Sequence, residues 1–283
     1  MRLRSLLFTP GDRPERFDKA LASGADAVIL DLEDSVAPAN KAMARQAVRA
    51  ALERPVRPAR VFVRINPLGG LHLQADLAAI GGGRPDGVVM PKAEGAGSLT
   101  ALARLLSEAG EPDMAILPIV TETPAAMFKL GEYGEVASSL VGLTWGAEDL
   151  PAALGASTSR EADGTYTPPY ALARSLTLFA AGAADVAAIE TVFPDVRDLE
   201  GLKVYAERGR RDGFSGMLAL HPAQVPVINA AFAPGDAELA FAKRVVAAFD
   251  AAPGAGVLLL DGKMVDAPHL KQARRVLSQA EGA

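Results

Sequence analysis

Carboxylate side chains follow several short apolar segments of this sequence, at the points where the segments end. Glu122 ends the segment "AILPIVTE" (115–122), and Asp149 closely follows "LVGLTWG" (140–146). If these segments are neighbouring parallel strands, the two side chains can meet at one edge of the sheet. Carboxylate oxygens, with other positions left to water and substrate oxygens, suit Mg²⁺, and Mn²⁺ fits a similar ligand set. The pattern therefore predicts a divalent metal site on Glu122 and Asp149.

Two cationic side chains end other apolar segments, Arg64 in "VFVRIN" and Lys92 in "GVVMPK". A metal ion polarises a substrate carbonyl and stabilises a developing alkoxide or enolate. The planar fork of Arg64 can bind a substrate carboxylate. These residue types predict a site for an anionic substrate beside a cation. Further polar residues at segment ends are Asp31, Glu33, Asp34, Asn66, Glu94, Glu148, Glu190, Asp195, His221 and Gln224.

The same acids have a simpler explanation. Acids at a strand–helix junction often cap the next helix and complement its dipole. Residues that could do only this are Asp12, Asp34, Glu148 and Asp149. His221, before Pro222, fits a structural hydrogen bond better than a catalytic role, and Trp145 is expected in or near the core. From the residues alone, both interpretations of the acids stay open.

Eight short apolar segments recur along the chain, with helix-like segments between them. Most are continuous apolar runs, as expected of parallel strands buried on both faces. Helix-like segments such as "NKAMARQAVRAALE" and "TPAAMFKLGEYGEVASS" place apolar residues three or four apart. The strand-like segments are 5–9, 27–33, 61–66, 87–92, 115–122, 140–146, 187–193 and 216–222.

Eight strand–helix units predict an α/β fold, the TIM (β/α)8 barrel, whose chemistry lies at the C-terminal ends of the strands. A doubly wound sheet shares the alternation, but neither a G-x-G-x-x-G fingerprint after the first strand nor a Walker A motif occurs. Residues 156–169, rich in turn formers, predict a long loop. We expect a barrel catalytic domain over 1–232 and a C-terminal helical extension over 233–283, serving as a lid or an oligomer contact.

Composition excludes several classes of protein. The chain has 283 residues, no cysteine and a net charge of −5, so disulfides, thiol catalysis and a general nucleic-acid surface are not expected. A three-histidine zinc site would need all 3 histidines, which are widely spread. The apolar stretch at the start is too short for a signal peptide, and no run is long enough for a membrane span. We therefore expect a soluble cytoplasmic protein with no nucleic-acid or membrane partner.

Seven motifs follow one another along almost the whole chain: "RSLLFTPGDRPERFDKA", "GADAVILDLEDSVAPANK", "VRIN", "GVVMPKAE", "PIVTETPAA", "WGAEDLPAALG" and "DGKMVDAPHLKQA". Together they resemble the citrate lyase β-subunit (citryl-CoA lyase) family of the HpcH/HpaI aldolase superfamily, TIM barrels that make or break carbon–carbon bonds. The combination of "TPGDRPERF" with "DLEDSV" is the most specific part. The resemblance implies a Mg²⁺-dependent lyase acting on a CoA thioester.

The resemblance also implies roles for single residues. The Glu of "ET" and the last Asp of "GxED" are metal ligands in the family, here Glu122 and Asp149, the pair already selected from the segment ends. Arg64, from "VRIN", is similar to the residue that binds the oxo-acid product. Asp266, from "GKMVDAP", resembles an acid that reaches a neighbouring subunit's site in related malyl-CoA lyases. A homotrimer or hexamer is then expected.

The implied reaction cleaves a β-hydroxyacyl thioester such as citryl-CoA into acetyl-CoA and an oxo-acid such as oxaloacetate. Asp266 would protonate the departing enolate, and Glu33 would order waters or a basic partner around the metal. The substrate-binding groups are Arg64, Glu122 through the metal, and the backbone N–H groups of Ala147 and Glu148 at a helix start.

Other functions stay open beside this one. A stand-alone member could be a malyl-CoA or citramalyl-CoA lyase or a malyl-CoA thioesterase, whereas citrate lyase itself needs α and acyl-carrier subunits. A phosphoenolpyruvate/isocitrate-type enzyme would usually bring a cysteine-bearing loop, which this chain lacks. A non-catalytic regulatory barrel would not need Glu122 and Asp149, and both are present.

Overall fold

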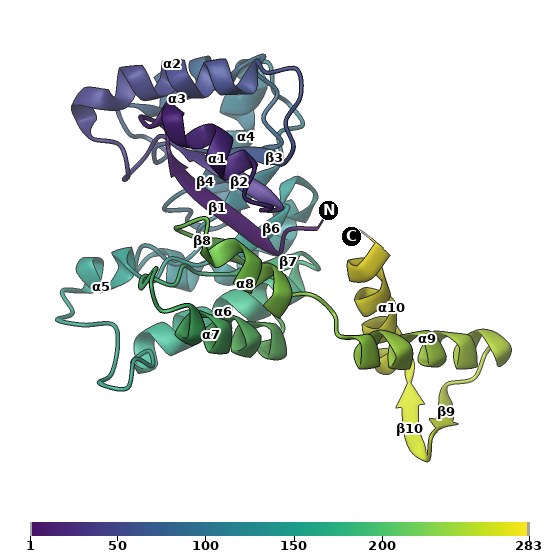
Figure 1. The fold of residues 1–283 in the computed structure, drawn as a ribbon. Coiled ribbons are helices and arrows are strands. Elements are labelled where there is room, and N and C mark those ends of the chain that lie inside the picture. The colour runs from purple at the N-terminus through teal and green to yellow at the C-terminus, as the bar shows by residue number, and fades with distance from the viewer. Residues whose placement is uncertain (1, 282–283) are drawn as a thin grey trace. The chain divides into compact units, whose positions relative to one another are not determined.

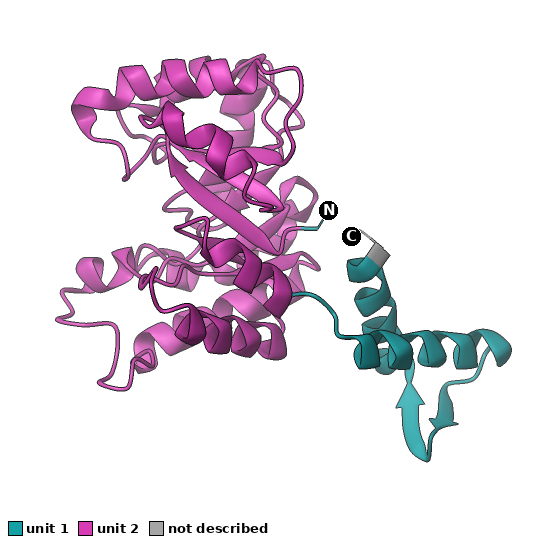
Figure 2. Ribbon diagram, in the orientation of Figure 1, with its two compact units in different colours: residues 1–2, 232–283 teal, residues 3–231 magenta. Residues whose placement is uncertain are grey.

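Eight parallel strands, alternating with helical segments, form the larger of the two units into which the chain divides (Figures 1 and 2). The structure is a computed structural model that describes residues 2–281. The larger unit spans residues 3–231, and the smaller comprises residues 1–2 and 232–283. Among the described residues, no helix has the length and apolar character needed to cross a membrane.

The strands of the larger unit are short and almost entirely buried. They are β1 (Ser5–Pro10), β2 (Ala27–Asp31), β3 (Arg60–Arg64), β4 (Gly87–Met90), β5 (Ile116–Pro118), β6 (Gly142–Thr144), β7 (Ala187–Glu190) and β8 (Gly216–Ala219). The α-helices between and after them are α1 (Phe17–Leu21), α2 (Lys41–Leu52), α3 (Leu73–Ile80), α4 (Gly95–Glu108), α5 (Asp149–Leu154), α6 (Pro168–Ala183), α7 (Leu199–Asp212) and α8 (Gln224–Ala231).

The sheet closes on itself. Its strand order is β5-β4-β3-β2-β1-β8-β7-β6, and every ladder in it is parallel. The outer strands β5 and β6 meet through isolated parallel bridges, Ile116 with Leu140 and Ile119 with Thr144. The Val120 N–H donates to the Thr144 carbonyl at 2.9 Å across the same seam. These contacts complete the ring, and the predicted (β/α)8 barrel is confirmed.

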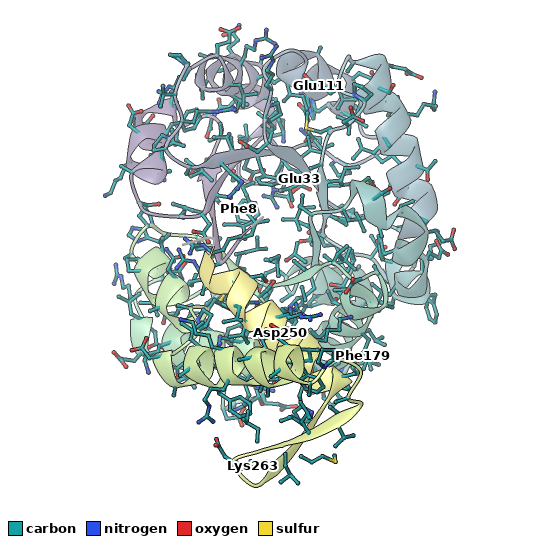
Figure 3. All side chains as sticks on the ribbon, turned by 90° about the vertical axis from the view of Figure 1, so that its right-hand side faces the viewer. Phe8, Glu33, Glu111, Phe179, Asp250 and Lys263 are labelled. Carbon is teal, nitrogen blue, oxygen red and sulfur yellow. The ribbon has the colours of Figure 1, made fainter. Side chains whose placement is uncertain are left out.

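The barrel interior is filled by apolar side chains from almost all of the strands. The buried cluster consists of Leu3, Leu6, Ala27, Ile29, Phe62, Val89, Leu117, Ile119, Ile189 and Leu218. Because side chains alternate along a strand, the residues two positions beyond Ile29 and Phe62 face the same interior. Those residues are Asp31 and Arg64. Figure 3 shows Phe8 and Glu33 within the barrel, with Glu111 on its outer side. The apolar lining therefore gives way to charged groups at the C-terminal ends of the strands.

The segment after β5, predicted to be helical, is not an α-helix. It contains two 3₁₀ segments, η3 (Ala126–Phe128) and η4 (Leu130–Ser139), with non-helical angles at Val136. Glycines at 131 and 134 weaken α-helical propensity. Tyr133 is fully buried, and its hydroxyl accepts from the Gly95 N–H and donates to the Ala93 carbonyl. Tertiary packing thus decides the conformation here. Shorter 3₁₀ segments, η1 (Pro14–Arg16) and η2 (Pro38–Asn40), precede α1 and α2.

The smaller unit has its own core. It contains α9 (Asp236–Ala251), an antiparallel hairpin of β9 (Val257–Leu260) and β10 (Lys263–Asp266), and α10 (Ala267–Glu281). Ala242, Val245, Val265, Ala273 and Val276 form its buried cluster. The predicted C-terminal helical extension is confirmed, with a hairpin between its two helices.

Candidate active site

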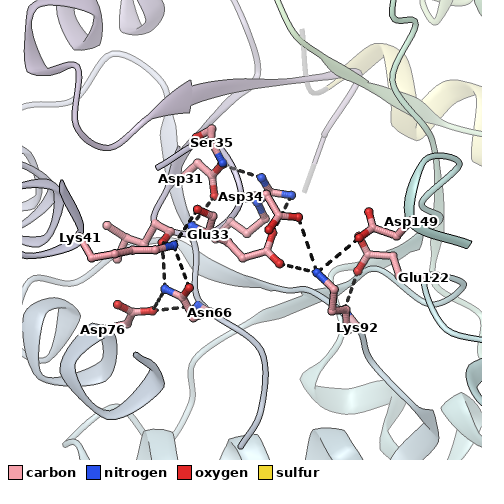
Figure 4. A network of polar contacts seen from close by, with 12 residues as sticks. Asp31, Glu33, Asp34, Ser35, Lys41, Asn66, Asp76, Lys92, Glu122 and Asp149 are labelled. Carbon is pink, nitrogen blue, oxygen red and sulfur yellow. Dashed lines mark hydrogen bonds and ion pairs between the residues drawn. The ribbon is translucent and has the colours of Figure 1, made fainter. Parts of the chain in front are cut away.

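Charged side chains at the barrel mouth form a network of polar contacts (Figure 4). One part of this network is a bidentate ion pair between Arg64 and Asp31. Arg64 donates through Nε to Asp31 Oδ1 at 2.7 Å and through Nη2 to Oδ2 at 2.6 Å. The two residues are register partners on β2 and β3, and the guanidinium lies 4.7 Å from the Phe8 ring centroid. Burial alone would raise the pKa of Asp31, but the hydrogen bond and charge of Arg64 outweigh it and lower that pKa. The pair is therefore charged, and Asp31 accepts from the Nε and Nη2 groups of the Arg64 guanidinium.

Glu33 links this pair to Lys92. One carboxylate oxygen of Glu33 accepts from Lys92 Nζ at 2.7 Å, and the other lies 3.1 Å from Arg64 Nη1. That second oxygen is buried and has no aligned hydrogen-bond donor among the described residues. The Glu33 carboxylate therefore keeps unused acceptor capacity in the site.

A buried lysine supports the backbone that carries Glu33. Lys41 Nζ donates to the carbonyls of Leu32 and Glu33, at 2.6 and 2.7 Å, and to Asn66 Oδ1 at 2.9 Å. Asn66 in turn donates to Asp76 Oδ2. Because Lys41 binds main-chain oxygens just beyond β2, it holds the chain where Glu33 projects into the barrel.

Lys92 connects the predicted metal ligands. Its backbone has φ +52°, unusual outside glycine, and this conformation points its N–H at Glu122 Oε2, 2.5 Å away. Its ammonium lies 3.4 Å from Asp149 Oδ1 and 3.6 Å from Asp34 Oδ2. Burial would lower the pKa of Lys92, but the hydrogen bond and charge of Glu33, with Glu122 and Asp149, raise it above its usual value. Lys92 therefore stays protonated between the acids.

Glu122 is a buried acid with little hydrogen bonding. Its side chain is 4% exposed, and the Lys92 N–H is the one hydrogen bond that its carboxylate receives from the described residues. Burial, the largest cause, raises the pKa of Glu122 to about 8, the Lys92 N–H opposes the rise, and the charges of Asp149 and Glu33 add to it. A carboxyl group held this way favours the arrival of a cation.

Gly146 leaves room for Glu122. A Cβ atom at position 146 would lie 2.6 Å from the Glu122 Cγ, closer than atoms can approach. The glycine of "WGAED" thus lets the chain after β6 pass directly beside the Glu122 side chain.

Asp149 is the first residue of α5, and Glu148 precedes it without making a side-chain cap. Among the described residues, the ion pair recorded for Asp149 is the one with Lys92, and its side chain is half-buried. The capping interpretation therefore gains no hydrogen bond from Glu148, and Asp149 has oxygens free for another ligand.

The acids surround a cavity of about 300 Å³. Its polar side is lined by Asp31, Arg64, Glu122, Glu148 and Asp149, and its apolar side by Phe8, Ile119, Trp145, Val192 and Leu218. The cavity has the size and mixed lining of a small-molecule site.

These residues fit a hard divalent cation. Glu122 and Asp149 offer oxygens that few protein donors satisfy, Glu33 keeps an unsatisfied buried oxygen, and acids outnumber the cations Arg64 and Lys92. Within residues 2–281, no group of three or more His, Asp or Glu side chains is arranged so that it could hold a metal ion. A site with two carboxylate ligands leaves most positions to water and substrate, which suits Mg²⁺.

The structure brings together five of the sequence-predicted site residues, namely Glu33, Arg64, Glu122, Glu148 and Asp149. Ala147 is buried and is not part of the cavity lining, and Asp266 belongs to the smaller unit, where its carboxylate lies 2.5 Å from His269 Nδ1.

Several polar residues at strand ends have structural roles. His221 accepts from the Ala223 N–H, as the sequence interpretation favoured. Gln224 accepts from the N–H groups of Leu220 and His221, and Asp195 accepts from backbone N–H groups in its own loop.

Lys92 is the member of the site that sequence reasoning undervalued. Its position at the end of β4, between the strands that carry Glu33 and Glu122, was the available signal. The left-handed backbone that turns its N–H onto Glu122 leaves no mark in the sequence.

Comparisons with known proteins agree with the geometry. Residues 4–222 match the HpcH/HpaI aldolase/citrate lyase family. The chain is 41% identical to a citrate lyase subunit beta-like protein of Mycobacterium tuberculosis over 276 residues, 97% of this chain and 94% of that protein. It is 35% identical to a (3S)-malyl-CoA thioesterase of Cereibacter sphaeroides over 284 residues, 98% of this chain and 94% of the other. A crystal structure of protein CitE from Mycobacterium tuberculosis, in complex with magnesium, acetoacetate and coenzyme A, superposes with a TM-score of 0.79 at 40% identity, covering 99% of this chain and 98% of that one.

Proposed function

The chain belongs to the HpcH/HpaI aldolase/citrate lyase family, and from this premise we propose that it is a Mg²⁺-dependent carbon–carbon lyase acting on a β-hydroxyacyl-CoA thioester. The observation that carries the proposal is the convergence of Glu122 and Asp149, from neighbouring strands, on one cavity that Arg64 also lines. Crystals of a 40% identical relative contain magnesium, acetoacetate and coenzyme A, which supports both the metal and the thioester.

Glu122 and Asp149 would hold the metal, with Mn²⁺ as an alternative to Mg²⁺. When bound, the ion supplies Lewis-acid stabilisation to the oxygens of the oxo-acid. Arg64 uses the guanidinium N–H groups that Asp31 and Glu33 leave free to orient a substrate carboxylate. Glu33 keeps Arg64 and Lys92 in place, since its carboxylate contacts both.

The reaction needs no co-substrate. The substrate hydroxyl loses its proton to a base, the hydroxyl carbon becomes the carbonyl of the oxo-acid, and the adjacent carbon–carbon bond breaks. The electron pair of that bond passes into the thioester enolate, which gains one proton to become the acyl-CoA product. Oxaloacetate would be the oxo-acid from citryl-CoA, pyruvate from citramalyl-CoA and glyoxylate from malyl-CoA.

The thioester would extend into a second cavity. This space of about 400 Å³ shares Phe8, Pro10, Arg16 and Leu220 with the first cavity, and its lining adds Lys19. Two cationic side chains at this end suit the phosphate groups of CoA.

Asp266 is proposed to protonate the enolate in the site of a neighbouring copy within a homotrimer or hexamer. Its carboxylate lies 2.5 Å from His269 Nδ1, so the two side chains act as one hydrogen-bonded pair. Co-expression of Asp266→Asn with Glu122→Gln tests this idea. Mixed oligomers should recover part of the activity that each variant lacks alone, and no recovery would place Asp266 outside the shared site.

The decisive experiment is a cleavage assay across citryl-, malyl- and citramalyl-CoA with and without Mg²⁺, detecting both the oxo-acid and the CoA product. We expect an oxo-acid and acetyl-CoA from at least one substrate, and only with the metal present. Failure on all three would contradict the lyase function and favour either a role that needs citrate lyase α and acyl-carrier subunits or a regulatory barrel.

Thioester hydrolysis is the second candidate, favoured by the 35% identical (3S)-malyl-CoA thioesterase. The same assay separates the two reactions. A thioesterase releases free CoA and the intact hydroxy acid, with no oxo-acid formed.

A further inference from the structure

Glu190 is a completely buried acid that the proposed reaction does not use. Its neighbour Ile189 belongs to the interior cluster of the barrel, so Glu190 points away from the interior, toward the helix layer. There it meets Arg174 from α6 and Tyr205 from α7. An unpaired carboxylate is costly to bury, so Glu190 needs hydrogen-bond and charge partners that offset its loss of hydration.

Both oxygens of the Glu190 carboxylate accept hydrogen bonds. Oε1 accepts from Trp145 Nε1 at 2.6 Å, from the Tyr205 hydroxyl at 3.0 Å and from the Thr191 N–H at 3.0 Å. Oε2 accepts from Arg174 Nε at 2.7 Å, and Arg174 also donates to Asp212. The shortest of these bonds holds the Trp145 indole.

Trp145 stands between this network and the proposed active site. It is 0% exposed, yet it lines the cavity beside Ile119 and Glu122. On another side the indole packs edge-on against Tyr166, with ring centroids 5.0 Å apart. Arg160 lies over the Tyr166 ring and donates to its hydroxyl. The indole is thus held at its N–H and along an edge.

We propose that Glu190 is a positioning residue that fixes the Trp145 indole as a rigid wall of the cavity, and that this wall sets the largest 2-oxo acid the cavity admits. The inference rests on the proposed function for its ligand class. We call the hydrogen bond between Glu190 and the Trp145 indole the clamp, and it does not depend on the proposed function.

Only a carboxylate can serve all of these donors. A glutamine at position 190 has the same shape but one acceptor oxygen. If that oxygen faces Trp145, its NH₂ group meets Arg174, and if it faces Arg174, its NH₂ group meets the indole N–H. Glu190→Gln therefore removes the acceptor of either Trp145 or Arg174 without changing the packed volume, and it also removes the negative charge that holds both donors. A loosened indole cannot exclude an extra methylene group from the cavity.

Trp145 is the single tryptophan of the chain, so its fluorescence reports the wall directly. We expect weak acrylamide quenching in the wild type and at least about a twofold larger quenching constant in Glu190→Gln, because the group that holds the indole loses its charge and one of its two acceptor oxygens. The matched control is Glu207→Gln, an exposed acid on α7 that pairs with Lys203. It should quench as the wild type does.

Ligand size is tested by calorimetry with Mg²⁺ and either oxaloacetate or 2-oxoglutarate, which is longer by one methylene group. We expect the wild type to favour oxaloacetate by about tenfold or more, the usual discrimination of one methylene group in a hydrophobic pocket. Glu190→Gln should bind oxaloacetate about tenfold more weakly and lose most of the preference, and Trp145→Leu should favour 2-oxoglutarate.

The outcomes separate the inference from the proposed function. If the wild type binds neither acid with Mg²⁺, the proposed function and the size limit both fall, and quenching still decides the clamp. If the acids bind but Glu190→Gln keeps wild-type quenching and preference, the inference is overturned while the function stands. Should Glu190→Gln not fold, Tyr205→Phe removes one hydrogen bond from the same oxygen and must shift quenching and preference in the same direction, or the clamp is refuted.

Discussion

Glu122 and Glu190 are two buried glutamates near the ends of barrel strands, and their surroundings are opposite. Glu190 receives hydrogen bonds from Trp145, Tyr205, Thr191 and Arg174. Glu122 receives one, from the Lys92 N–H, and lies among other acids. The protein satisfies the Glu190 carboxylate with hydrogen bonds, whereas the Glu122 carboxylate is left with oxygens that a bound ligand can use.

This difference shows how one fold uses the same residue type for two purposes. A saturated buried carboxylate fixes its donors in space, because moving any of them leaves a polar group unpaired. The Glu122 carboxylate, which receives one hydrogen bond and has its pKa raised to about 8, keeps oxygens that can bind a cation. Glu190 is therefore expected to control geometry, and Glu122 to control metal binding.

Glu122→Gln should produce the largest effect. Losing one of two carboxylate ligands should reduce kcat/KM by about a thousandfold or more and remove measurable Mg²⁺ binding in calorimetry. Folding should be retained or improved, since a buried acid with one hydrogen bond is replaced by a neutral amide. Mg²⁺ affinity equal to that of the wild type would show that Glu122 is not a metal ligand and that it does not differ from Glu190 in this respect.

Glu190→Gln should show the reverse pattern. We expect the free energy of unfolding to fall by about 2–4 kcal/mol, because a buried charged pair with Arg174 is broken. Mg²⁺ affinity without oxo-acid should stay within about twofold of the wild type, since Glu190 does not line the cavity. Urea titration measures the stability, and calorimetry measures the Mg²⁺ affinity. If Glu190→Gln lost Mg²⁺ affinity and kept its stability, Glu190 would belong to the metal site rather than to the support of Trp145.

Asp31 extends the comparison to an acid that is satisfied by Arg64 and by the backbone N–H groups of Glu33 and Ser35. Its pKa is lowered in the folded state, so it contributes stability above its unfolded pKa and loses it as pH falls through the lower folded value. At pH 7, the free energy of unfolding of Asp31→Asn should be about 2 kcal/mol lower than that of the wild type. That gap should shrink below about pH 4 in denaturant titrations. A constant gap would mean that shape rather than charge holds the pair.

Lys92→Met should give the smallest effect, and in the opposite direction. The ammonium 3.4 Å from Asp149 opposes a second cation, so its removal should tighten Mg²⁺ binding by about threefold to tenfold. The Lys92 N–H still reaches Glu122, because it belongs to the backbone. Calorimetry measures the Mg²⁺ affinity of Lys92→Met and of a control variant, Lys129→Met. Lys129 forms an ion pair with Glu94. Weaker Mg²⁺ binding in Lys92→Met would show that Lys92 supports the metal site.

The barrel and the convergence of its polar residues could be predicted because both depend on local pattern. Continuous apolar runs separated by helix-like segments require parallel strands, and parallel strands bring their C-terminal ends to one face. Arg64, Glu122 and Asp149 were predicted to meet on that reasoning, and they line one cavity. The 3₁₀ segments after β5 were mispredicted, because buried contacts of Tyr133 outweigh the helical spacing.

The sequence by itself determined the order of strands and helices, the closed parallel barrel and the acids and arginine that face its mouth. Only the tertiary structure decided which acid is satisfied and which is left open. Glu122 and Glu190 look alike in the sequence, since each ends an apolar run before a threonine. Apart from the adjacent Thr191 N–H, their hydrogen-bond donors lie 15 to 45 positions away in the sequence. The donor from Lys92 also depends on a left-handed backbone angle. Hydrogen bonding and desolvation of a buried carboxylate depend on those distant neighbours, and no local pattern encodes them.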